Sequence, residues 1–197
     1  SLARSVERRL TLLDAPGADN AFQLVLPLGD GMLREDEEPD VELAARGLAD
    51  AAGEMRWLRR IHALAKIATE RESKVGALRR LLRRSGESAI VFTEYRDTLQ
   101  HLVTALSPGE GFGRIATLHG GTTAAERGRE GRRFTHGDAR VLLATDAASE
   151  GLNLHHRCRL VINLEMPWTP LRVEQRIGRV DRLGQARRVH GLGLVGR

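Results

Sequence analysis

The sequence predicts an α/β fold, in which a parallel β-sheet carries helices on both faces and follows a mostly helical N-terminal extension. Two observations lead to this prediction. From residue 88 onward, short apolar runs alternate with amphipathic stretches of helical periodicity, which is the pattern of successive βαβ units. The hydrophobic fraction of 41% is also high enough for a packed core.

Five short apolar runs are expected to form the strands. They are residues 89–93, 114–118, 140–145, 160–164 and 189–195. Ligands of such sheets bind beyond the carboxyl ends of the strands, so the residues that follow each run are the first candidates for a site.

Four amphipathic stretches are expected to form the helices of this domain. They are residues 74–84, 95–106, 122–134 and 169–177. In the third of them, Thr123 and Glu126 offer a capping box at the start and Gly137 closes the end.

The N-terminal part is interpreted as a separate region. Residues 1–72 form the extension and linker, and residues 73–197 form the main domain. Within the extension, residues 41–69 have the periodicity of one or two helices, with Ile61 and Leu64 on the stripe that faces a core. The chain begins with Ser1 rather than a methionine, so we expect it to be part of a longer protein.

The cysteine and histidine content favours a reducing, cytoplasmic location. Cys158 is the only cysteine, which rules out an intramolecular disulfide and gives no support to a thiolate zinc site. His155 and His156 lie close by in the sequence, but no carboxylate or second histidine pair completes a metal site. A polar loop is the better interpretation. No apolar run reaches the length of a membrane span, so no membrane partner is expected.

The positive charge is concentrated near the C-terminus. The net charge is +5, and residues 172–197 contain seven arginines against two carboxylates, so the rest of the chain is neutral. Such a surface fits polyanions, either nucleic acid or nucleotide phosphates. A solvated arginine face is the alternative.

Residues 142–154 form the first segment whose residue types suggest a binding or catalytic role. A buried strand runs into a polar loop of small residues, in which Gly151 allows a ligand to approach the backbone closely. Hydroxyls and amides there can hold a phosphate, and Glu150 or Asn153 can bond a ribose. From the pattern alone, a tight strand-to-helix turn explains the segment equally well.

Residues 174–185 form the second segment whose residue types suggest a binding or catalytic role. Arg176, Arg179 and Arg182 recur every three residues and lie near one another if the segment is helical. Three guanidinium groups on one face need anions to neutralise them, and their geometry suits phosphate oxygens. A salt-bridged surface helix is the alternative, but Gly178 and Gly184 argue against it because glycine weakens a helix.

These segments resemble the motifs of superfamily-two helicases. Residues 174–185 resemble motif VI and residues 142–154 resemble motif V, while residues 90–95 and 118–121 resemble motifs IV and IVa. Their order and spacing are those of a C-terminal RecA-like lobe. The Gly-Leu-Asn-Leu of motif V, the Pro-Trp-Thr-Pro of residues 167–170 and the Gly-Gln ending of motif VI are similar to SWI/SNF-like ATPases, and Gln-Arg-Ile-Gly-Arg is most similar to bacterial RapA-like members.

The resemblance implies roles by position. Arg179 and Arg182 would be arginine fingers that reach the γ-phosphate of ATP, and Gln175 would stand at the γ-phosphate side of the cleft. The remaining positions fall into a nucleotide-contacting group and a group that holds the nucleic-acid backbone. These groups are Glu150, Gly151 and Asn153, and Thr93, Arg96, Gly120 and Thr145, respectively.

The sequence contains neither a Gly-x-x-x-x-Gly-Lys-Ser/Thr loop nor an acidic metal motif. The resemblance therefore implies that ATP and Mg²⁺ are held by a first RecA-like lobe of the same full-length chain, and that this chain alone is inactive. The expected function is the C-terminal motor lobe of an ATP-dependent nucleic-acid translocase or remodeller, with double-stranded DNA as partner and RNA polymerase or another protein as a further one. The alternative is a non-catalytic RecA-like module that binds nucleic acid or protein.

Overall fold

The computed structural model describes residues 2–14, 48, 50–70, 73–106, 111–146 and 154–195. The chain divides into two compact units, one within the first 72 residues and the other comprising Ser73–Arg197 and a short stretch of earlier residues. Among the described residues, no helix combines the length and the apolar character that crossing a bilayer requires.

In the first unit, helix α1 (Leu2–Asp14) packs on helix α3 (Ala51–Glu70). Arg9 of α1 forms an ion pair with Glu54 of α3, with a nitrogen–oxygen distance of 2.9 Å. The predicted core stripe of this region is wrong for Ile61 and Leu64, whose exposed fractions are 38% and 58%. Amphipathic periodicity marks an apolar face, but it does not supply a partner to cover that face.

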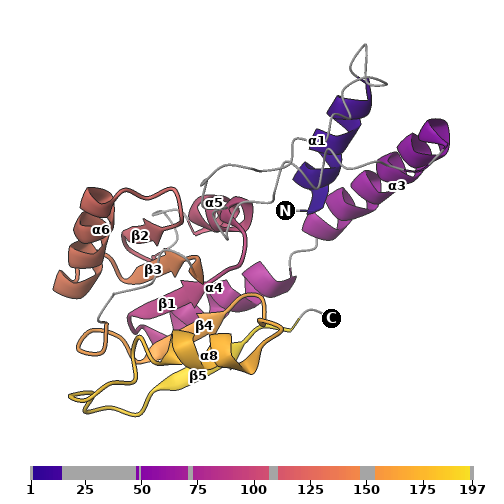
Figure 1. The fold of residues 1–197 in the computed structure, drawn as a ribbon. Helices are drawn as coiled ribbons and strands as arrows, with labels where there is room; N and C mark the ends of the chain where they lie inside the picture. Colours follow the sequence, from indigo (N-terminus) through magenta and orange to yellow (C-terminus); the bar gives the residue numbers. More distant parts are fainter. Residues whose placement is uncertain are drawn as a thin grey trace. The chain divides into compact units, whose positions relative to one another are not determined.

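The second unit is a five-stranded sheet in the order β2-β3-β1-β4-β5 with every neighbouring pair parallel (Figure 1). Its strands are β1 (Ala89–Phe92), β2 (Ile115–Leu118), β3 (Val141–Ala144), β4 (Leu160–Asn163) and β5 (His190–Gly193). Its helices are α4 (Ser73–Ser85), α5 (Arg96–Ala105), α6 (Ala124–His136) and α8 (Pro170–Ile177). The predicted fold class is confirmed, and each strand and helix predicted from residue 73 onward lies within a few residues of its observed position.

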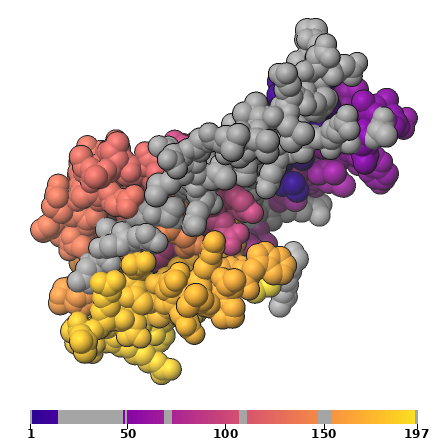
Figure 2. Space-filling view, in the orientation of Figure 1, coloured from indigo at the N-terminus to yellow at the C-terminus, as the bar shows by residue number. Residues whose placement is uncertain are grey.

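The strands bury side chains on both faces because successive residues of a strand point to opposite sides. On one face, Val91 of β1 belongs to a core cluster with Leu78 of α4 and Leu102 of α5. On the other face, Phe92 belongs to a cluster with Phe134 of α6. The face drawn in Figure 2 shows α6 and the region of α8 and β5 at the surface of this unit.

Helix α6 begins and ends as the sequence predicts. The Glu126 amide donates to the Thr123 hydroxyl at 3.3 Å, and the Thr123 amide donates to the Glu126 carboxylate at 3.0 Å, which completes the capping box. Gly137 ends the helix with φ of 95°, a left-handed conformation that favours glycine.

Candidate functional site

All five strands end level with one another, so the loops that follow them meet at one edge of the sheet. Phe92 lies beside Ala144 and Asn163, and Ala144 lies beside Leu118. The segments quoted above for motifs IV, IVa and V run along or end their strands and continue into the loops at this carboxyl edge. The sequence-based expectation that these segments converge is therefore confirmed for their described residues.

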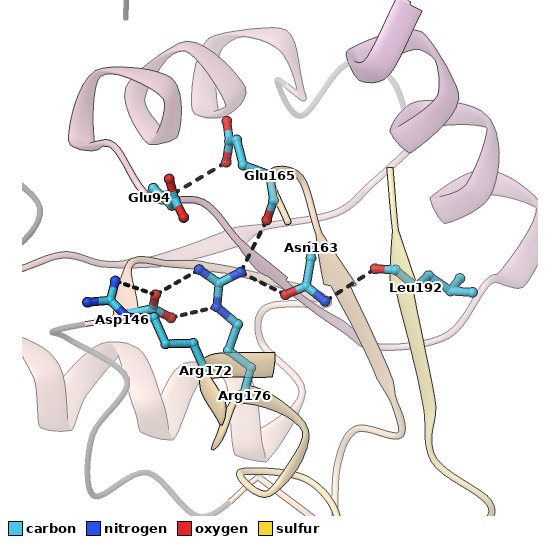
Figure 3. Close-up of polar contacts among 7 residues, drawn as sticks. All are labelled: Glu94, Asp146, Asn163, Glu165, Arg172, Arg176 and Leu192. Atoms are coloured by element: carbon cyan, nitrogen blue, oxygen red, sulfur yellow. Dashed lines mark hydrogen bonds and ion pairs between the residues drawn. The ribbon is translucent and has the colours of Figure 1, made fainter. Parts of the chain in front are cut away.

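Arg176 of α8 is the centre of a polar network at this edge (Figure 3). Its exposed fraction is 2%, and its Nε and Nη2 donate to the two oxygens of Asp146 at 2.6 and 2.7 Å. Its Nη1 donates to Asn163 Oδ1 at 2.8 Å and to the Glu165 carbonyl at 3.3 Å. The guanidinium carbon also lies 5.1 Å from the centroid of the Phe92 ring. Each nitrogen of this guanidinium therefore has a hydrogen-bond partner inside the chain.

The three arginines of the 174–185 segment are consequently not equivalent. Helix α8 ends at Ile177, and residues 178–180 continue as turns rather than as a helix. Arg176 is buried on its carboxylate, whereas Arg179 is partly exposed and Arg182 is exposed. In the part of the chain that the structure describes, no hydrogen bond or ion pair engages the Arg179 guanidinium, and Arg182 Nε donates only to the Gly178 carbonyl at 3.0 Å. Gln175 is exposed.

The Gly-Gln ending of this segment holds the turn to the loop before β4. Gln185 Nε2 donates to the carbonyls of His155 at 2.6 Å and Cys158 at 3.0 Å. Gly184 has φ of 97°, and a Cβ there would lie 3.3 Å from His155 Nε2. The left-handed φ of Gly184 explains the glycine at this position, whereas Gly178 has an ordinary helical φ of −61°.

The four residues predicted to hold the nucleic-acid backbone all lie at the carboxyl edge, but they differ in accessibility. Thr93 and Thr145 are fully buried, and their amides donate to the carbonyls of the neighbouring strands at 3.1 and 3.0 Å. Arg96 begins α5, and its Nη1 lies 3.3 Å from where a Cβ on Gly121 would be. Arg96 and the partly exposed Gly120 therefore lie close together at the surface.

A family model described as the helicase conserved C-terminal domain matches residues 73–184. The chain belongs to this family. The resemblance to a superfamily-two lobe inferred from motifs IV, IVa, V and VI is confirmed.

Two curated relatives are each similar to a little more than half of this chain. The uncharacterized ATP-dependent helicase YqhH of Bacillus subtilis (strain 168) is 40% identical over 112 residues, which is 56% of this chain and 19% of that protein. The RNA polymerase-associated protein RapA of Yersinia pestis (strain Pestoides F) is 36% identical over 111 residues, or 55% of this chain and 11% of that protein. The match thus spans a small part of either relative.

Solved structures agree on the fold. A DEAD box protein from Methanococcus jannaschii superposes with a TM-score of 0.55 at 28% identity, over 64% of this chain and 34% of that one. The C-terminal part of the Fun30 ATPase domain superposes with a TM-score of 0.56 at 24% identity, over 62% of this chain and 40% of that one.

The nucleotide-contacting positions predicted in the helicase domain, Glu150, Gly151 and Asn153, lie outside the described residues. Among the residues that are described, no group of three or more histidine, cysteine and acidic side chains could hold a metal ion. The rings of His155 and His156 lie 3.6 Å apart, and the pKa of His155 is lowered by burial first and then by the charges of His156 and Arg182.

Sequence reasoning did not identify Asp146, Asn163 and Glu165 as partners of Arg176 in this polar network. Each lies at or just beyond the carboxyl end of a predicted strand, and this position was the available signal. Glu165 accepts a hydrogen bond from the Glu94 amide at 3.3 Å. Burial raises the pKa of its carboxyl group, against the opposing effects of the Thr93 side chain and the Glu94 amide.

Proposed function

We propose that this chain is the C-terminal motor lobe of an ATP-dependent translocase or remodeller that acts on double-stranded DNA in the cytoplasm. The observation that carries the proposal is that the three arginines of motif VI differ in their partners. Arg176 is occupied by Asp146 and Asn163, whereas the guanidinium groups of Arg179 and Arg182 have no carboxylate partner among the described residues. A guanidinium at the motif edge without an internal carboxylate partner suits an anion from outside the chain.

The residues present fit one side of an ATP site and not the other. Arg179 and Arg182 would stabilise charge on the γ-phosphate, and Gln175 would line the same side of the cleft. Among the described residues, no cluster of three or more acidic, histidine or cysteine side chains is placed to hold Mg²⁺. We therefore assign the phosphate loop and the Mg²⁺ ligands to a first lobe of the same full-length protein, and infer that this chain alone has no ATPase activity. ATP hydrolysis would supply the energy for lobe closure and opening.

The nucleic-acid path of the motor is proposed along the carboxyl edge. Arg96 and Gly120 would contact the backbone directly, whereas the buried Thr93 and Thr145 would shape the loops that do so. Contacts of this kind position a strand and carry no sequence information. The SWI/SNF-like motif details favour double-stranded DNA. The name of the RapA relative, which is RNA polymerase-associated, makes a polymerase a further candidate partner.

The test is the rate of nucleic-acid-stimulated ATP hydrolysis by the full-length protein with Arg179 replaced by alanine or by lysine. An arginine finger contributes a factor of about 10³–10⁵ in rate, so we expect a loss of that order for Arg179→Ala. Lysine keeps the charge but lacks the planar fork, so Arg179→Lys should fail nearly as badly. ATP affinity and melting temperature should change little, because this side chain is not part of a core.

The matched control is Arg132→Ala, which removes an exposed arginine from α6 and should leave turnover within a few-fold of the wild type. A structural role for Arg179 would give a different pattern, in which the alanine variant melts earlier and lysine rescues it. ATP turnover by residues 1–197 alone, measured in a preparation free of contaminating ATPases and persisting in Arg179→Ala, would contradict the half-site proposal.

A further inference from the structure

The amino edge of the sheet, opposite the motif edge, carries a row of arginines. Because the first residues of the strands are in register, the residues that precede them are also neighbours. Arg114, Arg140 and Arg159 directly precede β2, β3 and β4. Backbone hydrogen bonds confirm the row: the Arg140 amide donates to the Arg114 carbonyl at 3.1 Å, and the His190 amide donates to the Arg159 carbonyl at 2.8 Å.

Other elements bring further arginines to the same edge. Helix α4 ends there with Arg83 and Arg84, and Arg140 Nη2 donates to the carbonyl of Leu82 at 3.3 Å. The guanidinium of Arg157 lies near the end of α6, 3.0 Å from where a Cβ on Gly137 would be. Two more arginines lie just before β5. The amino-edge arginines are Arg83, Arg84, Arg114, Arg140, Arg157, Arg159, Arg187 and Arg188.

Few negative charges balance this edge. In the described loops that lead into the five strands, the carboxylates are Glu87, Asp138 and Asp181. Glu87 is occupied by Arg159, whose Nε donates to it at 2.6 Å, and this hydrogen bond is the main reason why the pKa of Glu87 is lowered. Arg114, Arg187 and Arg188 are exposed, and no ion pair with a described residue engages them. Like charges gathered in this way repel one another unless an external anion neutralises them.

We propose that the amino-edge arginines bind the phosphate backbone of nucleic acid, as a second contact surface separate from the motor cleft. The chemistry favours nucleic acid over an acidic protein. Guanidinium groups match phosphate oxygens. In the described loops that lead into the strands, Leu183 is the one large apolar side chain that is exposed, whereas protein interfaces have an apolar centre built from several residues. Four interstrand spacings extend the row over roughly 19 Å, long enough to follow several phosphates of a duplex strand.

This surface cannot be the path proposed for the motor. Each strand has four residues, so about 13 Å of sheet separates the amino edge from the carboxyl edge, where the residues of the proposed motor path, Arg96 and Gly120, lie. The surface goes beyond the proposed function, because it requires neither ATP nor a first lobe. A motor lobe with two nucleic-acid surfaces could hold one segment of a duplex while another segment passes through the cleft.

The experiment measures binding of a labelled duplex of about 20 base pairs to residues 1–197 by fluorescence anisotropy, between about 50 and 200 mM salt. The test variant combines Arg114→Ala, Arg187→Ala and Arg188→Ala. The matched control combines Arg56→Ala, Arg59→Ala and Arg60→Ala, which removes the same charge from exposed positions of α3. Each lost phosphate contact lowers the slope of log affinity against log salt by about 0.9.

For the test variant we expect a slope smaller by two to three, as three contacts of about 0.9 each require, and at least a tenfold loss of affinity at the lowest salt. The control should stay within about twofold of the wild type, and the corresponding triple lysine variant should keep most of the slope. Unchanged melting temperatures would show that the variants fold. Equal losses in test and control variants would overturn the proposal, since only net charge would then matter. Tighter binding of polyglutamate than of DNA, with the same arginine dependence, would also overturn it in favour of an acidic protein partner.

Discussion

Arg176 shows at the scale of a single residue why a repeated residue type need not have a repeated role. It is the largest fully buried side chain among the described residues. Burying a guanidinium is tolerable only if its charge is paired and its N–H groups are bonded. Asp146 and Asn163 satisfy both conditions and join the end of β3 to α8.

We predict that Arg176→Ala lowers the free energy of unfolding by about 3–5 kcal/mol, because it removes the buried bidentate partner of the Asp146 carboxylate. Arg176→Lys should recover little, since one ammonium cannot replace a bidentate fork. The measurement is urea denaturation of residues 1–197.

The control for Arg176 is the double variant Arg176→Met with Asp146→Ala. Removing both partners leaves no buried charge of this pair without its counterpart. The double variant should therefore lose less stability than the sum of the losses in the two single variants. If the stability losses of the two single variants simply add in the double variant, the side chains of Arg176 and Asp146 do not stabilise each other. Arg172 lies 3.9 Å from the same carboxylate but is half exposed, so its replacement should cost little.

At the scale of the elements, α8 and α6 are held in different ways. Helix α8 has eight residues, and Arg176 is its one buried side chain, so tertiary contacts of that residue fix its position. Helix α6 carries its own termination signals in the capping box and in Gly137. The ends of α6 are therefore local properties, whereas the placement of α8 is not.

We expect Thr123→Ala to destabilise the domain by about 1 kcal/mol through loss of the N-cap acceptor, and Thr123→Ser, which keeps a capping hydroxyl, to leave the stability nearly unchanged. Gly137→Ala should cost about 1–2 kcal/mol, because alanine is strained in the left-handed conformation that Gly137 adopts. Chemical denaturation of the three variants checks these values. Equal stability of Thr123→Ala and Thr123→Ser would show that the N-cap hydrogen bond does not contribute.

At the scale of the whole lobe, Cys158 reports on the integrity of the sheet. It is buried in the cluster that covers one face, and its thiol lies 3.2 Å from the carbonyl of Leu160. Burial raises the pKa of this thiol to about 11. Reaction with a reagent requires both exposure and ionisation, and the folded lobe opposes both.

We predict that Cys158 of the folded chain reacts with a thiol reagent at neutral pH only as fast as the lobe unfolds. The labelling rate should therefore rise with denaturant in step with global unfolding. Because the pKa is higher in the folded state than in the unfolded state, stability should fall as pH rises from about 8.5 towards 11. Cys158→Ala should remove this part of the pH dependence, and rapid labelling independent of denaturant would contradict the prediction.

Local patterns were enough to determine the fold class, the strands and helices from residue 73 onward, and the helicase motifs. β-Branched runs and helical periodicity act within a few residues, and the capping box and Gly137 are decided within one turn. The convergence of the motif segments on one edge also followed, because parallel strands connected by helices bring their carboxyl ends together.

Only the tertiary structure decided what the side chains at that edge do. The spacing of Arg176, Arg179 and Arg182 made them look alike, yet burial on Asp146 and Asn163 sets the first apart from the other two. The same holds for the exposed Ile61 and Leu64 and for the arginine row at the amino edge. Periodicity records which face of an element is apolar or charged, whereas partners from distant parts of the chain determine whether that face is covered, paired or left for a ligand.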